Sequence, residues 1–311
     1  MAITDTKKAE KPVGRVRFRG IMPALASPLE ESGDVKEKTL RSMLRYMIPT
    51  GVTGFYLCGA TGEGVVMKPD ARKRLAEITV EECKGKADVI DHIGAVDLRT
   101  AMDLAAHAAS VGVDAISSVP PFFYGYSEDE ILAYYKALAA ACPLPLIVYA
   151  SPLVNTQITA GLVSKLLAMP SVIGVKFTSY NYFEMRRIKE LDGGNINVIN
   201  GPDETLLCGL SMGADGGIGT TYNVMPRVFV RIYDAFRNGD LATAQENQFK
   251  ANRMISVMIK FGVLASMKEM LGIMGFDAGY CTFPLKRLSA EEAAGLRKEL
   301  ASLRFEKDYL A

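Results

Sequence analysis

Short apolar segments alternate with longer amphipathic segments from about residue 18 of this chain onward. This pattern is typical of repeated strand–helix units, which build parallel β-sheets. The intervening segments, such as VKEKTLRSMLRYMI and LRTAMDLAAHAASVG, predict helices, and several begin at a residue that can cap free backbone N–H groups, such as Asp97 or Ser127. The candidate strands number eight: RGIMPALAS (19–27), GFYLCG (54–59), DVIDHIGA (88–95), DAISSVP (114–120), PLIVYAS (145–151), VIGVKFT (172–178), NINVING (195–201) and GGIGTTY (216–222).

Eight such units in succession predict an α/β protein with a (β/α)8 TIM barrel. The main alternative is a doubly wound open sheet, which usually has a glycine-rich dinucleotide-binding turn after its first strand. The only comparable stretch, GATGEG, lacks the spacing of G-x-G-x-x-G and also the Gly-Lys-Ser/Thr of a P-loop. The sequence therefore favours the barrel.

The two ends of the chain differ from this repeating pattern. Residues 1–16 are polar and rich in lysine with no apolar segment behind them, which indicates a disordered tail rather than a signal peptide. Residues 238–311 contain further helical patterns but no further strand. We therefore expect a barrel over residues 17–237 and a helical extension over 238–311 that packs against it.

Composition excludes several classes of function. The 36 basic and 35 acidic residues nearly cancel, which argues against nucleic acid or an anionic membrane as a partner. The five cysteines lie far apart, without a C-x-x-C pair, and suggest reduced thiols rather than disulfides or a zinc site. Apolar runs are too short for a membrane span, and no cluster of histidines or acids predicts a metal site. The cytoplasm is the expected compartment.

The segment VIGVKFTS (172–179) places one lysine, Lys176, in an otherwise apolar strand. Burying an ammonium group costs several kcal/mol unless something compensates. One explanation is that the lysine head reaches water at the strand end. The other is chemical, because a desolvated lysine has a lowered pKa and can condense with a ketone or aldehyde as a Schiff base. We expect apolar neighbours in the same strand to exclude water from the amine, namely Val172, Ile173, Val175 and Phe177.

Other candidate residues follow neighbouring strands, where the loops of a barrel form its active site. Tyr149, at the end of its strand, could move protons beside an imine, although a tyrosine in a strand more often packs. The small residues of GATGE (59–63) and the hydroxyl of Thr61 could hold a carboxylate, although a tight turn alone would explain the glycines. His92, in the third strand, is more typical of a satisfied core residue.

The ordered motifs GATGEG, PPFFYGYS, IVYASP, GVKFTS, NGPDE and GADGGIGTTYN together resemble the N-acetylneuraminate lyase and dihydrodipicolinate synthase family over nearly the whole chain. The resemblance implies a TIM-barrel aldolase of the class I, Schiff-base type that acts on keto acids. It also implies a homotetramer and no metal or organic cofactor, since the covalent intermediate is a lysine imine with the substrate.

By this resemblance, Lys176 forms the imine and Tyr149 handles protons. Thr61 and the backbone of Ala60 bind the carboxylate of pyruvate. The Gly-x-Asp-Glu element is similar to the N-acetylneuraminate lyase branch. It implies a binding site for the hydroxylated tail of a sugar acid at Gly201, Asp203, Glu204, Thr178 and Thr220.

The resemblance implies cleavage of a 2-keto-3-deoxy sugar acid to pyruvate and an aldehyde, with N-acetylneuraminate, a sialic acid of carbohydrate metabolism, as the first candidate substrate. The alternatives are a 2-keto-3-deoxygluconate-type aldolase or dehydratase, or a keto-acid binder without catalysis. Dihydrodipicolinate synthase activity is disfavoured, because YASPLVNT lacks the arginine that the synthase branch carries after its strand tyrosine.

Two positions depart from the family pattern. Ala60 stands where the family usually has a serine or threonine that relays protons to the tyrosine. Phe123, followed by Tyr124, stands where many members contribute a tyrosine from a neighbouring subunit. Both changes remove hydroxyl groups that would otherwise support Tyr149, so water or the substrate's own carboxylate would have to replace them.

Overall fold

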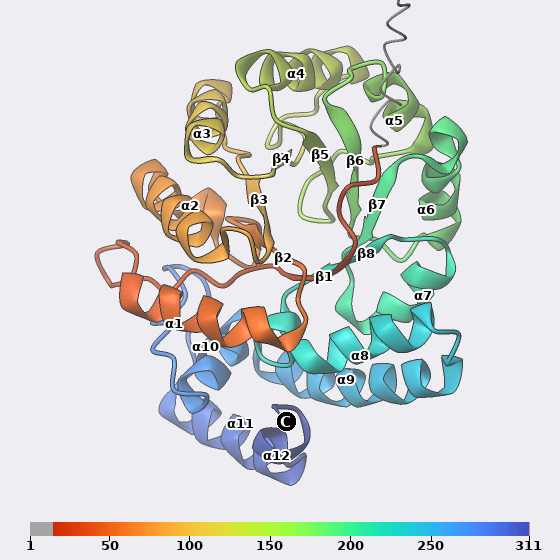
Figure 1. Cartoon of the computed structure of the whole chain (residues 1–311). Coiled ribbons are helices and arrows are strands. Elements are labelled where there is room, and N and C mark those ends of the chain that lie inside the picture. Colours follow the sequence, from red (N-terminus) through yellow and green to blue (C-terminus); the bar gives the residue numbers. More distant parts are fainter. Residues whose placement is uncertain (1–14, 311) are drawn as a thin grey trace, which may run out of the picture.

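Eight parallel strands form the centre of the computed structural model, which describes residues 15–310 (Figure 1). The predicted TIM barrel is confirmed, and each strand lies within the segment predicted for it. The strands are β1 (Gly20–Pro23), β2 (Gly54–Leu57), β3 (Asp88–His92), β4 (Ala115–Ser118), β5 (Leu146–Ala150), β6 (Val172–Phe177), β7 (Asn197–Asn200) and β8 (Gly216–Gly219).

Neighbouring strands pair in sequence order, and β1 pairs with β8, as a barrel requires. Between β1 and β2, the backbone N–H of Leu25 donates to the carbonyl oxygen of Tyr56 at 2.9 Å. The N–H of Thr53 donates to the carbonyl oxygen of Ile21, also at 2.9 Å. These two hydrogen bonds close the ring beyond the ends of the short strands.

A ring of helices surrounds the strands (Figure 1). Each strand is followed by a helix because a parallel neighbour can be reached only by a crossover. The helices are α1 (Glu37–Met47), α2 (Pro69–Cys83), α3 (Leu98–Val111), α4 (Glu128–Ala141), α5 (Ala160–Leu166), α6 (Tyr182–Lys189), α7 (Leu206–Ser211) and α8 (Pro226–Arg237), with short 3-10 turns η1 (Ile48–Thr50), η2 (Gly64–Val66), η3 (Leu191–Gly194), η4 (Asp203–Thr205) and η5 (Thr221–Asn223).

Four more helices follow the barrel: α9 (Leu241–Phe261), α10 (Val263–Ile273), α11 (Ala290–Ser302) and α12 (Phe305–Asp308). Helix α9 runs beside α8 on the outside of the barrel (Figure 1). Most of the tail predicted for residues 1–16 lies outside the described residues. Arg15, where the description begins, donates to the carbonyl oxygen of Leu167 at 3.0 Å. None of the helices within residues 15–310 has the length and apolarity of a membrane span.

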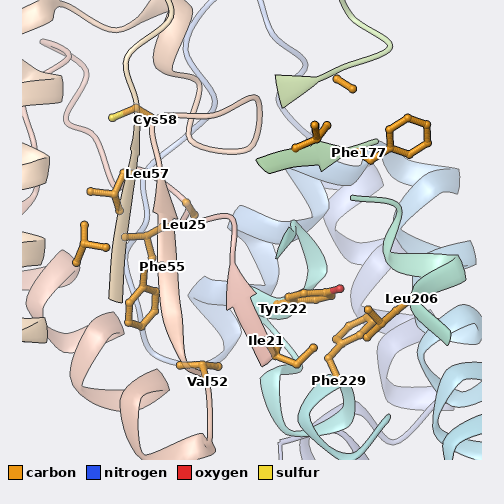
Figure 2. Close-up of a cluster of buried hydrophobic side chains, with 14 of the residues drawn as sticks. Ile21, Leu25, Val52, Phe55, Leu57, Cys58, Phe177, Leu206, Tyr222 and Phe229 are labelled. Atoms are coloured by element: carbon orange, nitrogen blue, oxygen red, sulfur yellow. The ribbon is translucent and has the colours of Figure 1, made fainter. Parts of the chain in front are cut away.

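The core has two layers, because successive side chains of a strand point to opposite faces. In β2, Phe55 and Leu57 join the large cluster between strands and helices, part of which Figure 2 shows. Tyr56, which lies between them in sequence, belongs to a smaller cluster that also contains Tyr149 and Ile173. This smaller cluster fills the barrel interior, directly below the loops that follow the strands.

Candidate active site

Lys176 lies in the barrel interior and is 4% exposed. Strand pairing sets Tyr149 of β5 directly beside it. The lysine Nζ lies 4.0 Å from the ring centroid of Tyr149 and 4.1 Å from that of Tyr56. No ion pair joins Lys176 to a carboxylate anywhere in the described part of the chain. The amine is therefore held between aromatic faces without a counter-charge in contact.

This environment shifts the pKa values of both partners. Burial lowers the pKa of Lys176, although the charges of Tyr149 and Asp203 act in the opposite direction. Burial alone would raise the pKa of Tyr149. The Lys176 charge and hydrogen bonding with Ser151 and Thr178 outweigh that effect and lower the pKa. The amine therefore loses its proton more readily than a free lysine does, which a nucleophilic amine requires.

The side chains that exclude water from the Lys176 amine differ from those expected. Val175 and Phe177 flank it in sequence, but they belong to the outer cluster between strands and helices. A bulge between β5 and β6 interrupts the alternation near Ile173, which alone of the expected walls joins the interior cluster. The rings of Tyr56 and Tyr149 replace the others, because residues adjacent to an inward-facing lysine must face outward.

Tyr56 is the component that sequence reasoning missed. It is fully buried, and its hydroxyl donates to Ser117 Oγ at 3.0 Å. Its ring meets that of Tyr149 edge to face, with centroids 6.0 Å apart. The alternation of GFYLCG could have revealed it, because Tyr56 is the aromatic residue on the inward face of that strand.

His92 also contacts Tyr149, at 5.9 Å between ring centroids. Its Nδ1 lies 3.0 Å from the carbonyl oxygen of Cys58, and its Nε2 lies 3.3 Å from the N–H of Val119. An N–H must donate to the first and a lone pair must accept from the second, so the ring is neutral. Burial, followed by the charge of Arg72, lowers the pKa of His92 to about 3. The ring is thus a satisfied core residue packed beside the candidate site.

The turn after β2 brings Thr61 to the barrel mouth. Thr61 is 5% exposed, and its Oγ1 lies 2.6 Å from Oγ1 of Thr220, at the end of β8. A Cβ on Gly64 would come within 1.8 Å of the carbonyl oxygen of Cys58, so the turn requires glycine there. Ala60 is exposed and supplies no side-chain hydrogen bond.

The side-chain carboxylate of Glu63 holds the same turn in place. Its Oε1 lies 2.8 Å from Nζ of Lys268 in α10, and its Oε2 accepts from the N–H of Thr282 at 2.6 Å. Glu63 adopts a positive φ of 58°. The buried carboxylate therefore connects the turn to α10 and to the segment between α10 and α11. It is an anchor rather than a ligand contact.

A cavity of about 800 Å³ opens over the ends of β5 to β8. Five predicted site residues line it: Thr178, Gly201, Asp203, Glu204 and Thr220. The lining does not include Lys176, Tyr149, Thr61 or Ala60. However, it does include Phe177 and Ala150, which are the next residues after Lys176 and Tyr149. The imine candidates are thus next in sequence to residues of the cavity without lining it, whereas the residues predicted to hold the sugar tail do line it.

Glycines allow the residues of this cavity to approach one another. A Cβ on Gly201 would lie 2.0 Å from Oγ1 of Thr178, so these two strand ends touch through a glycine. Asp203 accepts from the N–H and the hydroxyl of Thr221, at 2.7 and 2.6 Å. Burial raises the pKa of Asp203 to about 6.

The described residues contain no group of three or more His, Cys, Asp or Glu side chains suited to hold a metal ion.

Comparison with known proteins adds independent information. Residues 17–303 match the model of the dihydrodipicolinate synthetase family. The chain is 36% identical over 286 residues to the N-acetylneuraminate lyase of Rhizobium meliloti, a match that covers 92% of this chain and 95% of that protein.

Solved structures agree with this match. The protein CdNal from Clostridium difficile, in complex with mannosamine, has a TM-score of 0.88 at 31% identity, and the match covers 93% of this chain and 100% of that one. The sialic acid aldolase of Ruminococcus gnavus has a TM-score of 0.89 at 28% identity over 94% of this chain and 99% of that one.

Proposed function

Because the chain belongs to the dihydrodipicolinate synthetase family, and is a carbon–carbon lyase of the aldolase type, we propose that it cleaves N-acetylneuraminate to N-acetylmannosamine and pyruvate. One observation carries the proposal: Lys176 is buried between Tyr149 and Tyr56 without a carboxylate partner. A lysine in this position is a better nucleophile than a free one, because its neutral form is more populated.

The reaction begins when the Lys176 amine attacks the C2 carbonyl of the keto acid. Loss of one water molecule gives the imine. The substrate carboxylate lies at the turn of Ala60 and Thr61, where the Thr61 hydroxyl and backbone N–H groups can donate to it. The imine then withdraws electrons from the C3–C4 bond.

Tyr149 accepts the proton of the C4 hydroxyl as the C3–C4 bond breaks, so that the leaving half departs as an aldehyde. The lowered pKa of Tyr149 favours this role, because a phenol that loses its proton more readily is the better general base near neutral pH. The enamine that remains on Lys176 takes up at C3 the proton that Tyr149 accepted, which restores Tyr149. Water then hydrolyses the imine, releases pyruvate and restores the amine, so one water is lost and one is consumed.

The tail of the sugar acid would extend from this point into the cavity over β5 to β8. Its size, about 800 Å³, is ample for a sugar-sized ligand. The lining of that space offers mainly hydrogen-bond acceptors and hydroxyl groups. The residues concerned are Gly201, Asp203, Glu204, Thr178 and Thr220. These groups suit a polyhydroxylated chain.

The test traps the imine. The protein is incubated with pyruvate and borohydride and then weighed by mass spectrometry, and pyruvate release from N-acetylneuraminate is assayed in parallel. We expect one lysine-linked adduct on the wild type and none on Lys176→Ala. A wild-type protein without an adduct, or an adduct on the alanine variant, contradicts the mechanism. An adduct without pyruvate release from N-acetylneuraminate contradicts the substrate and directs the assay to other 2-keto-3-deoxy acids.

A further inference from the structure

Tyr180 lies in the loop between β6 and α6, at the rim of the cavity. Its hydroxyl donates to a carboxylate oxygen of Glu204, which follows β7. The tyrosine is 64% exposed, so core packing does not explain its position. The contact therefore links two neighbouring loops over the space into which the substrate tail would extend.

The hydrogen-bonding capacity of this pair is one-sided. The phenol of Tyr180 has a single proton, and that proton is given to Glu204. The contact raises the pKa of Tyr180 to about 12, so the phenol stays protonated at neutral pH. What remains are lone pairs on the phenol oxygen and on the carboxylate. The pair can therefore only accept hydrogen bonds, and it is suited to a ligand that donates several from adjacent positions.

The main chain holds Glu204 in place. Asn252 of α9 donates to its carbonyl oxygen at 3.0 Å. Asp203, next to it, is fixed by Thr221. The carboxylate of Glu204 thus projects from an anchored turn, and Tyr180 sets the direction of that carboxylate.

The charges around the cavity have one sign. Its charged lining residues are Glu184, Asp203 and Glu204, and no lysine or arginine lines it. A phosphate or a second carboxylate on the substrate tail would be repelled here. A neutral polyol would instead find acceptors for its hydroxyl hydrogens.

We infer that Tyr180 orients the Glu204 carboxylate and adds a further acceptor for hydroxyl groups on the outer part of the substrate tail, which makes Tyr180 a specificity-determining residue for long, uncharged tails. The inference rests on the proposed function, since it assigns the far end of the same substrate. It predicts that acids with a short tail do not use Tyr180.

The experiment compares Tyr180→Phe with Tyr182→Phe. Both variants remove one phenol hydroxyl, but that of Tyr182 points to Thr205 and its residue does not line the cavity. KM and kcat are measured with N-acetylneuraminate and with 2-keto-3-deoxygluconate, whose tail is shorter. For Tyr180→Phe we expect KM for the long acid to rise about fivefold, the effect of one hydrogen bond, while kcat changes less than twofold.

KM for the short acid should change less than twofold in the same variant, and Tyr182→Phe should leave both values as in the wild type. An unchanged KM for the long acid, an equal rise for both acids, or the same rise in Tyr182→Phe overturns the inference. Borohydride trapping of pyruvate, which has no tail, reports on the proposed function separately.

A binding measurement keeps the inference testable even if cleavage fails. Titration calorimetry of N-acetylneuraminate into Lys176→Ala protein measures tail binding without chemistry. Adding Tyr180→Phe should weaken the Kd about fivefold. Equal Kd values, or no binding by the protein that retains Tyr180, overturn the inference whatever the trapping experiment shows.

Discussion

Lys176 in β6 and Lys268 in α10 are buried to almost the same extent, with 4% and 5% of their surfaces exposed, but their surroundings differ. Lys268 donates to the carbonyl oxygens of Ser27 and Tyr280, at 3.1 and 2.9 Å, and it pairs with Glu63. Lys176 has aromatic rings at 4.0 and 4.1 Å and no carboxylate in contact.

The comparison shows that burial alone does not decide what a lysine does. Two carbonyl oxygens accept hydrogen bonds from Lys268 and the Glu63 carboxylate pairs with its charge, so Lys268 is suited to hold separate segments of the chain together. Lys176 has no ion pair with a carboxylate, and burial lowers its pKa although its contact with Tyr149 acts in the opposite direction. Lys268 therefore has a structural role in an ion pair, whereas Lys176 loses its proton more readily than a free lysine does.

The largest expected effect comes from replacing Lys176 with methionine, which has a similar volume and no charge. Without the amine no imine forms, and we expect kcat to fall by about a thousandfold or more. The free energy of unfolding should stay the same or rise, because no carboxylate is left unpaired. Steady-state kinetics and urea unfolding measure the two quantities. A variant that loses activity because it is destabilised would break the comparison.

The same substitution at Lys268 should have the opposite pattern. Lys268→Met leaves the Glu63 carboxylate buried without its cation, and breaking a buried pair in this way costs about 3–5 kcal/mol of unfolding free energy. Urea unfolding measures the loss. Lys260→Met provides the matched control, because it breaks an ion pair with Glu299 at the surface and should cost less than about 1 kcal/mol.

A second variant separates charge from packing at this site. In the double variant Glu63→Gln with Lys268→Met, the buried charge is absent, and the amide oxygen of the introduced glutamine can still accept from the N–H of Thr282. The double variant should therefore be more stable than Lys268→Met alone. If it is less stable, the unpaired carboxylate is not the source of the loss.

The sequence predicted the surroundings of Lys176 better than those of Lys268. The barrel rule places strand ends together, so the positions of Tyr149 and Lys176 follow from the order of the units. Tyr56 is also recoverable from the alternation in its strand. The expected walls at Val175 and Phe177 were wrong because residues next to an inward-facing side chain point outward, to the other layer.

The pairing of Glu63 with Lys268 could not be predicted in the same way. The partner of Glu63 comes from a helix outside the repeating pattern, far along the chain. Nothing in local periodicity specifies how that helix packs. The contact between Tyr180 and Glu204 was missed for a similar reason, since both residues lie in loops whose conformations do not follow the period of strands or helices.

The pH dependence of stability sharpens the comparison further. The folded-state pKa of Lys176 lies below the ordinary value of 10.5, so between these two values the unfolded chain binds more protons than the folded one. The free energy of unfolding of the wild type should therefore rise with pH across this window. Below the window the cost of burying the amine is present in full, and above it the cost vanishes.

This contribution is measured as the difference between the wild type and Lys176→Met in urea unfolding at a series of neutral to alkaline pH values. The difference should shrink as pH rises. The rate of pyruvate trapping should increase over the same range, because only the neutral amine attacks. A stability difference that does not change with pH would indicate that Lys176 keeps an ordinary pKa and that its aromatic surroundings stabilise the charged form instead.

The smallest expected effect comes from replacing Ala60, which stands where the family usually has a residue with a hydroxyl group. The Thr61 hydroxyl lies 2.6 Å from that of Thr220, and the side chain of Ala60 has no group that can relay a proton. A serine at position 60 could pass a proton between Tyr149 and the substrate, so Ala60→Ser should raise kcat about two- to tenfold if this transfer limits turnover. Steady-state kinetics checks the rise, and Ala60→Cys, which is similar in size but a weak donor, serves as the control. An unchanged or lower kcat in the serine variant means that water or the substrate carboxylate already carries the proton. The difference between Lys176 and Lys268 then lies wholly in the immediate contacts of each amine.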